Sequence, residues 1–338
     1  MEVRKEDKIQ VVHFQRRPRP GANFSLEFIF EDVRQQLEDR VDFKVIVADH
    51  YSNGILNRVK NIIGAYRQQG QVNHVTGDIH YINLLFNRKR SVLTILDCRI
   101  MQSGGKLQRL LFKWLWLKLP VWKAQRVTTI SEASKQDILK YTGCPPTKVS
   151  VIPVAVSEMY QPSPKLFNEN KPVLLQIGTA PNKNLERLFE AIHPIPCTLV
   201  IIGMLDDRHR HSLEKWGIHY ENKSNLSPLE MYGEYIRCDL VTFVSTFEGF
   251  GMPIIEANWV ERPVIAGRNS SMIDVAGKAA LLVDAFSVAE IRQGIERIIA
   301  DAHLRDQLLE QGKINRERFS ATRIANMYYE VYADVADE

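Results

Sequence analysis

Long hydrophobic runs are absent from this sequence of 338 residues. No apolar stretch reaches the roughly 18 residues that a membrane-spanning helix requires. The first ten residues, MEVRKEDKIQ, include six charged side chains and lack the apolar core of a secretory signal. The sequence therefore predicts a cytoplasmic protein that has neither a signal peptide nor a transmembrane helix.

The sequence has few cysteines and only a small excess of positive charge. The four cysteines, Cys98, Cys144, Cys197 and Cys238, lie more than forty residues apart, which fits neither a CxxC metal site nor a small disulfide framework. The formal net charge is only +4, and the basic residues are spread along the chain. This distribution predicts no nucleic-acid partner, because proteins that bind nucleic acids concentrate their basic residues in a patch or tail.

Strand and helix patterns alternate through both halves of the chain. The length is about twice that of a usual domain, which predicts two globular units. Short β-branched runs separated by longer amphipathic stretches predict parallel βαβ units, and therefore two α/β domains. The strand-like runs are 11–14, 43–48, 91–96 and 126–131 in the first half, and 172–178, 198–203, 240–245 and 263–267 in the second.

A proline-rich connector lies between the two halves, at residues 151–172. Its composition places the domain boundary near Val156, which gives a first domain of residues 1–155 and a second of residues 156–318. The last segment, residues 319–338, has the apolar spacing of a helix. This helix could pack on either domain, including back on the first.

The segment LVTFVSTFEGFGMPIIEANWVERPVIAG, residues 240–267, carries the strongest chemical signal. It predicts a buried strand, a loop with two glycines and a helix that opens at Pro253. The unpaired amides of that first helical turn would form a site for phosphate. Glu248 would face a sugar, and Glu256 could accept both hydroxyls of a ribose. Alternatively, Glu256 only complements the helix dipole and Glu248 is an exposed loop acid.

This segment resembles the retaining family-4 glycosyltransferases of the GT-B fold, whose mark is S-x-x-E-G-F-G-x-P-x-x-E. The corresponding residues are Ser245, Glu248, Gly249, Phe250, Gly251, Met252, Pro253, Ile254 and Glu256. The resemblance extends through 269–284, 128–143 and 149–156. It implies two Rossmann-like domains that face each other across a cleft, the first binding the acceptor and the second the nucleotide sugar.

A second phosphate-binding element is predicted at residues 176–192, where a strand ends at Gly178 and a helix begins near Asn184 as N-cap. The resemblance implies that Lys183 contacts the donor phosphates and offsets leaving-group charge without a metal. The alternative is a solvated loop lysine. Thr179 stands where the family often has an arginine. A second phosphate cation could come from the loop with Arg16, Arg17 and Arg19, or that loop could simply be solvated.

The remaining site residues follow from the resemblance. Gly21 matches the glycine-containing loop after the first strand, and the backbone near Ser227 matches the segment beneath the nucleobase. Loops 74–81 and 93–98 resemble those that bring a histidine or an aspartate to the reacting sugar. Leu96 replaces the usual histidine, so Asp97 and His80 are the catalytic candidates, and a packing role for His80 is an equal alternative.

Residues 104–126 contain six cations, three tryptophans and no acid. Their helical projection gathers the cations beside an apolar stripe, which suits the surface of an anionic membrane. This predicts contact with the inner face of a membrane, where the acceptor would be lipid-linked. An internal helix that packs its leucines and tryptophans on the first domain explains the pattern equally well.

The resemblance implies retaining transfer of a hexose-type sugar from a nucleoside-diphosphate sugar to a glycan or lipid-linked acceptor, in polysaccharide or cell-envelope glycan synthesis. It implies no cofactor, no metal and no protein nucleophile. The alternatives are a catalytically inactive sugar-nucleotide-binding protein and a GT-B-fold epimerase or phosphorylase. A dehydrogenase is disfavoured, because no G-x-G-x-x-G motif follows the first strand.

Overall fold

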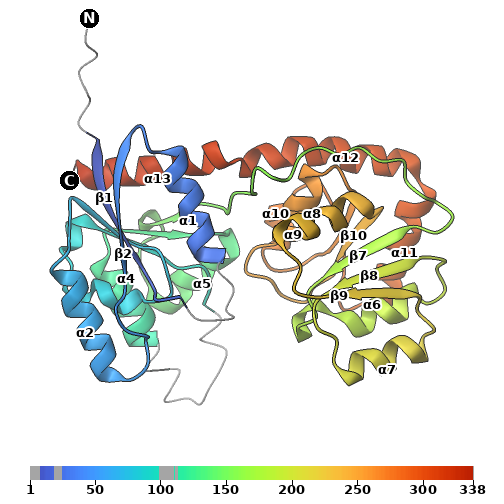
Figure 1. Cartoon of the computed structure of the whole chain (residues 1–338), viewed down its shortest axis with the longest axis horizontal. Coiled ribbons are helices and arrows are strands. Elements are labelled where there is room, and N and C mark those ends of the chain that lie inside the picture. The colour runs from blue at the N-terminus through green and yellow to red at the C-terminus, as the bar shows by residue number, and fades with distance from the viewer. Residues whose placement is uncertain (1–7, 19–24, 99–109, 111–112, 338) are drawn as a thin grey trace, which may run out of the picture. The chain divides into compact units, whose positions relative to one another are not determined.

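The computed structural model describes residues 8–18, 25–98, 110 and 113–337. The chain forms two compact units (Figure 1). The first unit comprises Met1–Ala155 together with Ala321–Glu338, and the second comprises Val156–Ser320. The division falls after Ala155, and the second unit runs to Ser320, two residues beyond the predicted end at residue 318.

The first unit is built on a parallel sheet of six strands in the order β2-β1-β3-β4-β5-β6. The strands are β1 (Ile9–Gln15), β2 (Val41–Val47), β3 (Val72–Val75), β4 (Ser91–Thr94), β5 (Arg126–Thr129) and β6 (Val149–Val151). The helices are α1 (Ser25–Gln36), α2 (Ile55–Tyr66), η1 (His80–Leu85), η2 (Arg88–Arg90), η4 (Lys113–Lys118), α4 (Leu119–Lys123), α5 (Glu132–Thr142), η5 (Pro146–Lys148) and α13 (Ala321–Ala336).

Successive side chains of the strands pack on opposite faces of this sheet. Val11 of β1 belongs to a core formed with α1 and α13, whereas Val12 belongs to a core formed with α2, η1, η4, α4 and α5. The terminal helix α13 therefore packs back on the first unit, one of the two positions that its apolar spacing allowed.

A buried network of hydrogen bonds joins α13 to the sheet of the first unit. The hydroxyl of Tyr332 lies 2.9 Å from Nε2 of His13 and 2.8 Å from Nδ1 of His74. Nε2 of His74 lies 2.7 Å from the hydroxyl of Thr94, which in turn bonds Thr128. Burial lowers the pKa of His74 to about 3. Burial, together with the nearby His74 and Arg34, also holds the pKa of His13 well below its usual value.

The second unit is built on another parallel sheet of six strands, in the order β12-β11-β10-β7-β8-β9. The strands are β7 (Val173–Ile177), β8 (Thr198–Ile202), β9 (Tyr220–Lys223), β10 (Leu240–Phe243), β11 (Val264–Gly267) and β12 (Leu281–Val283). The helices are η6 (Pro181–Lys183), α6 (Leu185–Ile192), α7 (Asp207–Lys215), α8 (Pro228–Arg237), α9 (Met252–Trp259), α10 (Met272–Ala276), α11 (Val288–Ala300), α12 (Ala302–Arg316) and η7 (Glu317–Phe319).

The two parallel sheets confirm the predicted α/β class. All eight runs predicted as strands contain strands, and the structure adds β3, β6, β9 and β12. Two of these added strands read VNHV and YENK, and their polar residues interrupt the apolar, β-branched pattern from which a strand is predicted. None of the described helices combines the length and the apolar character that crossing a bilayer requires.

We expect the first unit to lose stability as the pH falls from 7 to 5. His13 and His74 stay neutral in the fold because their pKa values are depressed, whereas the unfolded chain takes up protons near pH 6.5. Protonation therefore favours the unfolded state, by about 1.4 kcal/mol per pH unit for each histidine below that value. Hydrogen exchange of peptides from β3 and α13 at several pH values measures this effect.

The matched variant is His74→Gln, which removes one of the two titrating groups. We expect its free energy of unfolding to be lower at every pH. The part of the pH dependence that comes from the two histidines should be about half of that in the natural protein, because one of them is gone. An unchanged slope in this variant would contradict the assignment.

Candidate functional site

The carboxyl ends of β7 and β10 form the candidate site. β7 and β10 are adjacent and parallel, and β7 pairs with β8 on its other side. The chain therefore leaves β7 toward one edge of the sheet and later returns to β10 on the other side. Such a switch in strand order opens a crevice at the carboxyl ends of the strands, where open α/β sheets bind their ligands.

An ion pair between Lys183 and Glu248 occupies this position. Nζ of Lys183 lies 2.7 Å from Oε1 of Glu248, and the two side chains are 17% and 14% exposed. The side-chain amide of Asn182 donates to the same oxygen at 3.1 Å. The ammonium also lies 4.8 Å from the ring centroid of Phe243. An ammonium held in this way can exchange its carboxylate for another anion, such as a phosphate.

Gly178 makes room for the lysine. Its φ of +88° is in the left-handed region, and a Cβ at this position would lie only 2.8 Å from Cε of Lys183. Any larger residue would strain the backbone and displace the lysine side chain. The end of β7 is thus shaped so that Lys183 can lie across it.

Asn184 differs from its predicted role. It does precede α6, but its backbone is left-handed and its side chain makes no capping hydrogen bond. Its amide nitrogen instead donates to the carbonyls of Val244, at 3.0 Å, and Ala285, at 2.6 Å. The side chain therefore ties the loop after β7 to the loops after β10 and β12, and its oxygen accepts from Arg187 at 2.9 Å instead of capping the helix.

Two serines fix the loop that carries Glu248. The hydroxyls of Ser270 and Ser271 both donate to the carbonyl of Glu248, the second at 2.9 Å, and Ser271 also donates to the carbonyl of Phe250. The Phe250 ring packs edge-on against Phe319, with centroids 5.8 Å apart. The Phe250 side chain is thus buried within the second unit.

The helix after this loop opens as the sequence predicts, with one difference. Pro253 occupies its first turn, and Gly251 precedes it with a φ of +139°. The amide of Ile254, predicted to be unpaired, donates to the Gly251 carbonyl at 3.0 Å. The positive end of the helix dipole remains at this turn, but a ligand would have to compete for that amide.

Glu256 lies between two tyrosines. The hydroxyl of Tyr235, on α8, donates to Oε2 of Glu256, and the hydroxyl of Tyr160 is a second donor to the same carboxylate. Burial raises the pKa of Glu256, while the two tyrosine hydrogen bonds and the charge of Lys183 act in the opposite direction. The carboxylate is therefore oriented by its neighbours.

Two other donor-side candidates are engaged by the fold. Thr179 lies against the end of β8, where a Cβ on Gly203 would meet its methyl group at 3.0 Å. The Ser227 amide donates to the side chain of Glu230 at 2.7 Å, and its carbonyl accepts from Met231. Ser227 thus caps α8, and a nucleobase would have to compete with Glu230 for its amide.

The catalytic candidates of the first unit lie at the carboxyl ends of its strands. His80 opens η1, after β3, and is buried, with Nδ1 2.9 Å from the carbonyl of Trp116. Burial lowers the pKa of His80, although the charges of Asp78 and Asp97 raise it. Asp97 follows β4 and is partly buried. The structure thus brings His80 near Asp97 within one unit.

The basic loop after β1 is only partly described. Arg16 pairs with Asp78 at 3.4 Å, and Arg17 donates to the carbonyl of Asp49 at 2.6 Å. Gly21 and Arg19 lie outside the described residues. The two described arginines are thus engaged by groups of the first unit.

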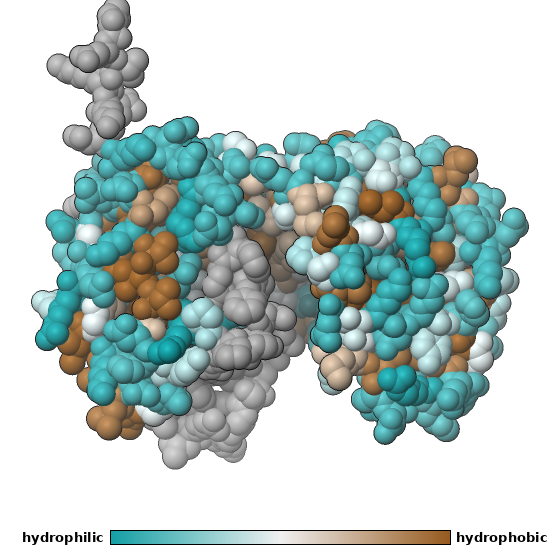
Figure 2. Space-filling view, in the orientation of Figure 1, coloured by the Kyte–Doolittle hydropathy of each residue, from teal (hydrophilic) through white to brown (hydrophobic). Residues whose placement is uncertain are grey.

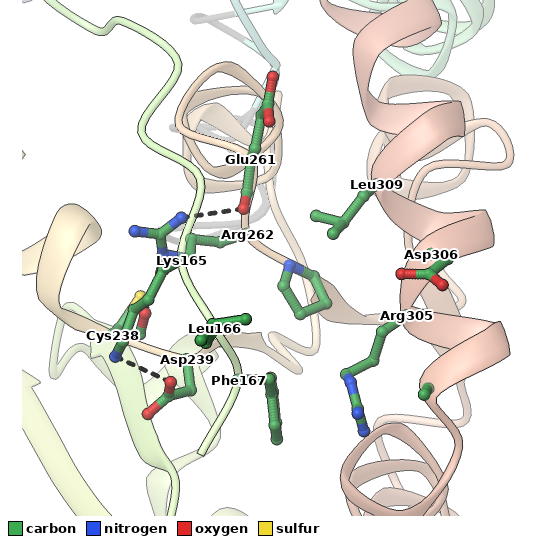
Figure 3. Close-up of a pocket in the computed structure, with 12 residues that line it drawn as sticks. Lys165, Leu166, Phe167, Cys238, Asp239, Glu261, Arg262, Arg305, Asp306 and Leu309 are labelled. Atoms are coloured by element: carbon green, nitrogen blue, oxygen red, sulfur yellow. Dashed lines mark hydrogen bonds and ion pairs between the residues drawn. The ribbon is translucent and has the colours of Figure 1, made fainter. Parts of the chain in front are cut away.

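A cavity of about 200 Å³ lies at the other end of the strands, beside the amino ends of β7 and β10 (Figure 3). Its cations are already bound within the protein. Lys165 pairs with the buried Asp239 at 2.8 Å, and Arg305 donates to the carbonyl of Ile298 at 2.9 Å. The guanidinium of Arg262 donates to the carbonyls of Ser163, Ile236, Cys238, Val260 and Glu261. These cations stabilise the fold, so we do not assign a ligand to this cavity.

Among the residues that the structure describes, no group of three or more His, Cys, Asp or Glu could hold a metal ion. The expectation of metal-free donor binding stays a prediction.

Sequence reasoning missed the side chains that support the predicted acids. These are Asn182, Tyr160, Tyr235, Ser270 and Ser271. All lie in segments for which the sequence indicated a connector, a loop or a family resemblance, but no spacing along the chain pairs them with Glu248 or Glu256. Their roles depend on contacts between segments far apart in sequence.

Comparison with known proteins agrees with this geometry. Residues 160–315 match the family model of glycosyl transferases group 1. The chain is 28% identical over 168 residues to an uncharacterized glycosyltransferase of Methanocaldococcus jannaschii, covering 46% of each chain. It is 27% identical over 238 residues to the O-antigen chain mannosyltransferase B of Escherichia coli, covering 61% of this chain and 60% of that relative. The chain thus spans about half the length of these relatives.

Solved structures show the same fold. Anabaena Alr3699/HepE, crystallised with UDP and glucose, has a TM-score of 0.76 at 16% identity and covers 96% of this chain and 99% of its own. A glycosyltransferase of Rickettsia africae has a TM-score of 0.76 at 15% identity, with coverages of 97% and 99%. These likenesses confirm two Rossmann-like units of the GT-B type. The match to the group 1 glycosyl transferases covers residues 160–315, which lie within the second unit.

The variant Gly178→Ala tests whether Lys183 needs the space beside this glycine in order to reach Glu248. The added methyl group should displace Lys183 from Glu248, in addition to straining the backbone. Gly217→Ala is the matched control, because its φ is +61° but no atom lies within 4 Å of the added Cβ. We expect Gly178→Ala to lower the free energy of unfolding by about 1–3 kcal/mol more than the control, as measured by urea unfolding. Equal losses would contradict the proposed packing.

Proposed function

We propose that this chain is a retaining glycosyltransferase that moves a hexose-type sugar from a nucleoside-diphosphate sugar to a glycan or lipid-linked acceptor, in polysaccharide or cell-envelope glycan synthesis. The observation that carries the proposal is the Lys183–Glu248 pair at the strand-order switch of the second unit. This pair lies within the region that matches the group 1 family model.

Donor binding would exchange the partners of this pair. A diphosphate brings more negative charge to Lys183 than one carboxylate does, so the ammonium would turn to the phosphates. Glu248 would then be free to accept hydrogen bonds from sugar hydroxyls. Asn182, which already donates to Glu248 at 3.1 Å, would keep the carboxylate in place during the exchange.

Transfer would break the bond between the anomeric carbon and the diphosphate oxygen, and the acceptor oxygen would bond the same carbon from the same face. The leaving phosphate would take the acceptor's proton, so no protein nucleophile is needed. Lys183 and the positive end of α9 would stabilise the charge that grows on the phosphate oxygens. We propose that these groups do so without a metal ion.

Glu256 would hold the ribose of the donor. Ribose hydroxyls donate hydrogen bonds, and a carboxylate oriented by Tyr235 and Tyr160 accepts them best when it is ionised. The other residues that we propose to contact the donor are Gly178, Thr179, Ser227, Gly249, Phe250, Gly251, Met252, Pro253 and Ile254. UDP in the HepE structure and the mannosyltransferase activity named for a relative both support a hexose nucleotide as donor.

The first unit would bind the acceptor, with His80 and Asp97 nearest to the reacting sugar. We also propose that the segment 104–126 places the enzyme at the inner face of an anionic membrane, where a lipid-linked acceptor is available. The structure describes residue 110 and residues 113–126 of this segment, and it exposes Leu110, Trp114, Leu115 and Trp122.

The second candidate function is an inactive sugar-nucleotide-binding protein, which the substitutions at Thr179 and Leu96 favour. Thermal stabilisation by a panel of UDP-, GDP-, ADP- and dTDP-sugars identifies the donor base, because a bound ligand raises the melting temperature. Transfer or hydrolysis of the best donor then separates the two functions. Stabilisation by none of the panel would overturn both.

Replacement of Glu248 tests its proposed contact with the sugar. Glu248→Gln keeps an oxygen that accepts from Asn182 and Lys183, but it loses the charge. Glu248→Ala loses both, and a severe loss of turnover is expected with the fold intact. We expect the glutamine variant to lose about 10²-fold in kcat, with little change in the affinity for a nucleoside diphosphate that lacks the sugar. Steady-state kinetics and calorimetry give these two quantities.

Turnover of Glu248→Gln within a few-fold of the natural protein would contradict the assigned role. So would an equal loss of affinity for the nucleotide and for the complete donor, because Glu248 would then not act on the sugar.

Replacement of Tyr235 tests the ionisation of Glu256. The tyrosine hydrogen bond lowers the pKa of Glu256, so Tyr235→Phe should raise that pKa further. Donor affinity should then begin to fall at a higher pH as the solution is acidified. Tyr232→Phe is the matched control, because Tyr232 lies on the same helix but donates to the carbonyl of Gln161. Nucleotide dissociation constants between pH 5 and 8 measure the shift, and an unshifted midpoint would remove this role.

A further inference from the structure

Helix α2 exposes its apolar side to solvent and buries a polar residue, whereas a surface helix normally does the opposite. Ile55 and Leu56 are each 78% exposed, and Val59, Ile63 and Tyr66 are exposed on the same side. At about 100° per residue these five side chains cover an arc of about 100°. The residues that α2 buries are Asn61 and Ala65. The most apolar side of the helix therefore faces away from the core.

The buried side of α2 accounts for this orientation. The Asn61 side chain accepts from the His50 amide at 3.1 Å, and it donates to the His50 carbonyl at 2.8 Å and to the Tyr81 hydroxyl at 3.2 Å. These bonds fix the rotation of the helix, because turning the apolar arc inward would leave the buried groups unpaired. The exposed arc is thus a stable feature of the fold.

More apolar side chains are exposed on the neighbouring elements of the same helical layer. Leu85 ends η1, Trp114 and Leu115 lie on η4, and Trp122 lies on α4, all of them exposed. Trp116 of η4 joins these elements to α2, because Arg58 of α2 stacks on its ring at 4.8 Å. Figure 2 shows hydrophobic side chains on the face of the first unit that is turned toward the viewer.

Described cations lie beside the tryptophans of this layer. Arg58 lies over the Trp116 ring and Arg88 lies 6.0 Å from the Trp122 ring centroid. Lys118 lies 4.7 Å from the Trp114 ring centroid, and Lys123 lies 5.9 Å from that of Trp122. Tryptophan beside lysine is the combination that suits the headgroup region of a bilayer.

We propose that the outward side of α2, together with η4 and α4, binds the surface of an anionic bilayer. We name this the lipid-binding surface and define it by Ile55, Leu56, Val59, Ile63, Leu85, Trp114, Leu115 and Trp122. It extends to α2 the membrane contact that is part of the proposed function and therefore rests on it. The apolar arc enters the acyl boundary, while the surrounding cations, such as Lys60 and Lys118, stay at the level of the anionic headgroups.

Charge favours a bilayer over a second copy of the chain as the occupant. In a symmetric dimer this surface would meet itself, so the cations of one copy would face those of the other. An anionic bilayer instead supplies the negative charge that α2, η4 and α4 lack, because none of these helices contains an acid.

Co-sedimentation of the full chain with vesicles tests the proposal. The vesicles are phosphatidylcholine alone and phosphatidylcholine mixed with phosphatidylglycerol. The double variant Ile55→Ser/Leu56→Ser should reduce the partition coefficient on the anionic vesicles by about tenfold or more. The matched control is Leu166→Ser/Met204→Ser in the second unit, where the side chains are 95% and 77% exposed. This control should bind as the natural chain does.

A charge variant measures the electrostatic contribution to lipid binding separately. Lys60→Glu/Lys118→Glu should also weaken binding, and binding of the natural chain should decrease as salt is added. The control Lys278→Glu lies in the second unit and should have little effect. Equal binding to neutral and anionic vesicles, or unchanged binding by the serine variant, would overturn the proposal.

Two further measurements distinguish lipid binding from dimerisation and from glycosyl transfer. Light scattering without lipid tests for a dimer, and a dimer that Ile55→Ser/Leu56→Ser dissociates would assign the surface to a second copy instead. Lipid binding is measured without donor or acceptor, so it can fail while glycosyl transfer to a water-soluble acceptor persists. Conversely, lipid binding that is lost in the serine variant would stand even if no sugar transfer were found.

Discussion

The candidate donor site depends on one ion pair whose partners lie 65 residues apart in sequence. Lys183 and Glu248 are both largely shielded from water, and a buried charge without its partner costs several kcal/mol. The pair therefore favours the arrangement in which the loops after β7 and β10 stay together. The same shielding makes the site ready for an anion, because the lysine is already desolvated when a phosphate arrives.

The rest of the second unit supports this arrangement through side chains that bind backbone carbonyls. The Asn184 amide bridges Val244 and Ala285, and Ser270 and Ser271 secure the carbonyl of Glu248. Polar side chains thus replace secondary structure in the loops of the site. A similar arrangement is found at the amino ends of the strands. There the guanidinium of Arg262 donates to five backbone carbonyls, which belong to the ends of two helices and to the connector.

The sequence predicts the parts of this molecule that are encoded by neighbouring residues. The strands rich in β-branched residues, the loop around Glu248 and the opening of a helix at Pro253 are local patterns. β3 was not predicted, because its buried His74 looks polar until Tyr332 supplies its partner from the far end of the chain. The pairing of Tyr235 with Glu256 and the outward apolar arc of α2 likewise follow from tertiary contacts. The donor, the acceptor and the roles of the site residues stay predictions.

The return of α13 to the first sheet makes the second unit an insertion within the first. The chain crosses from one unit to the other twice, after Ala155 and after Ser320. The two crossings are neighbours, because the amide of Val156 donates to the carbonyl of Phe319 at 3.3 Å. A module whose entry and exit adjoin can be exchanged for a homologous one without stretching the host. This connectivity would let one continuous segment, Val156–Ser320, be replaced as a whole, while the hydrogen bonds of Tyr332 hold α13 on the sheet of the first unit.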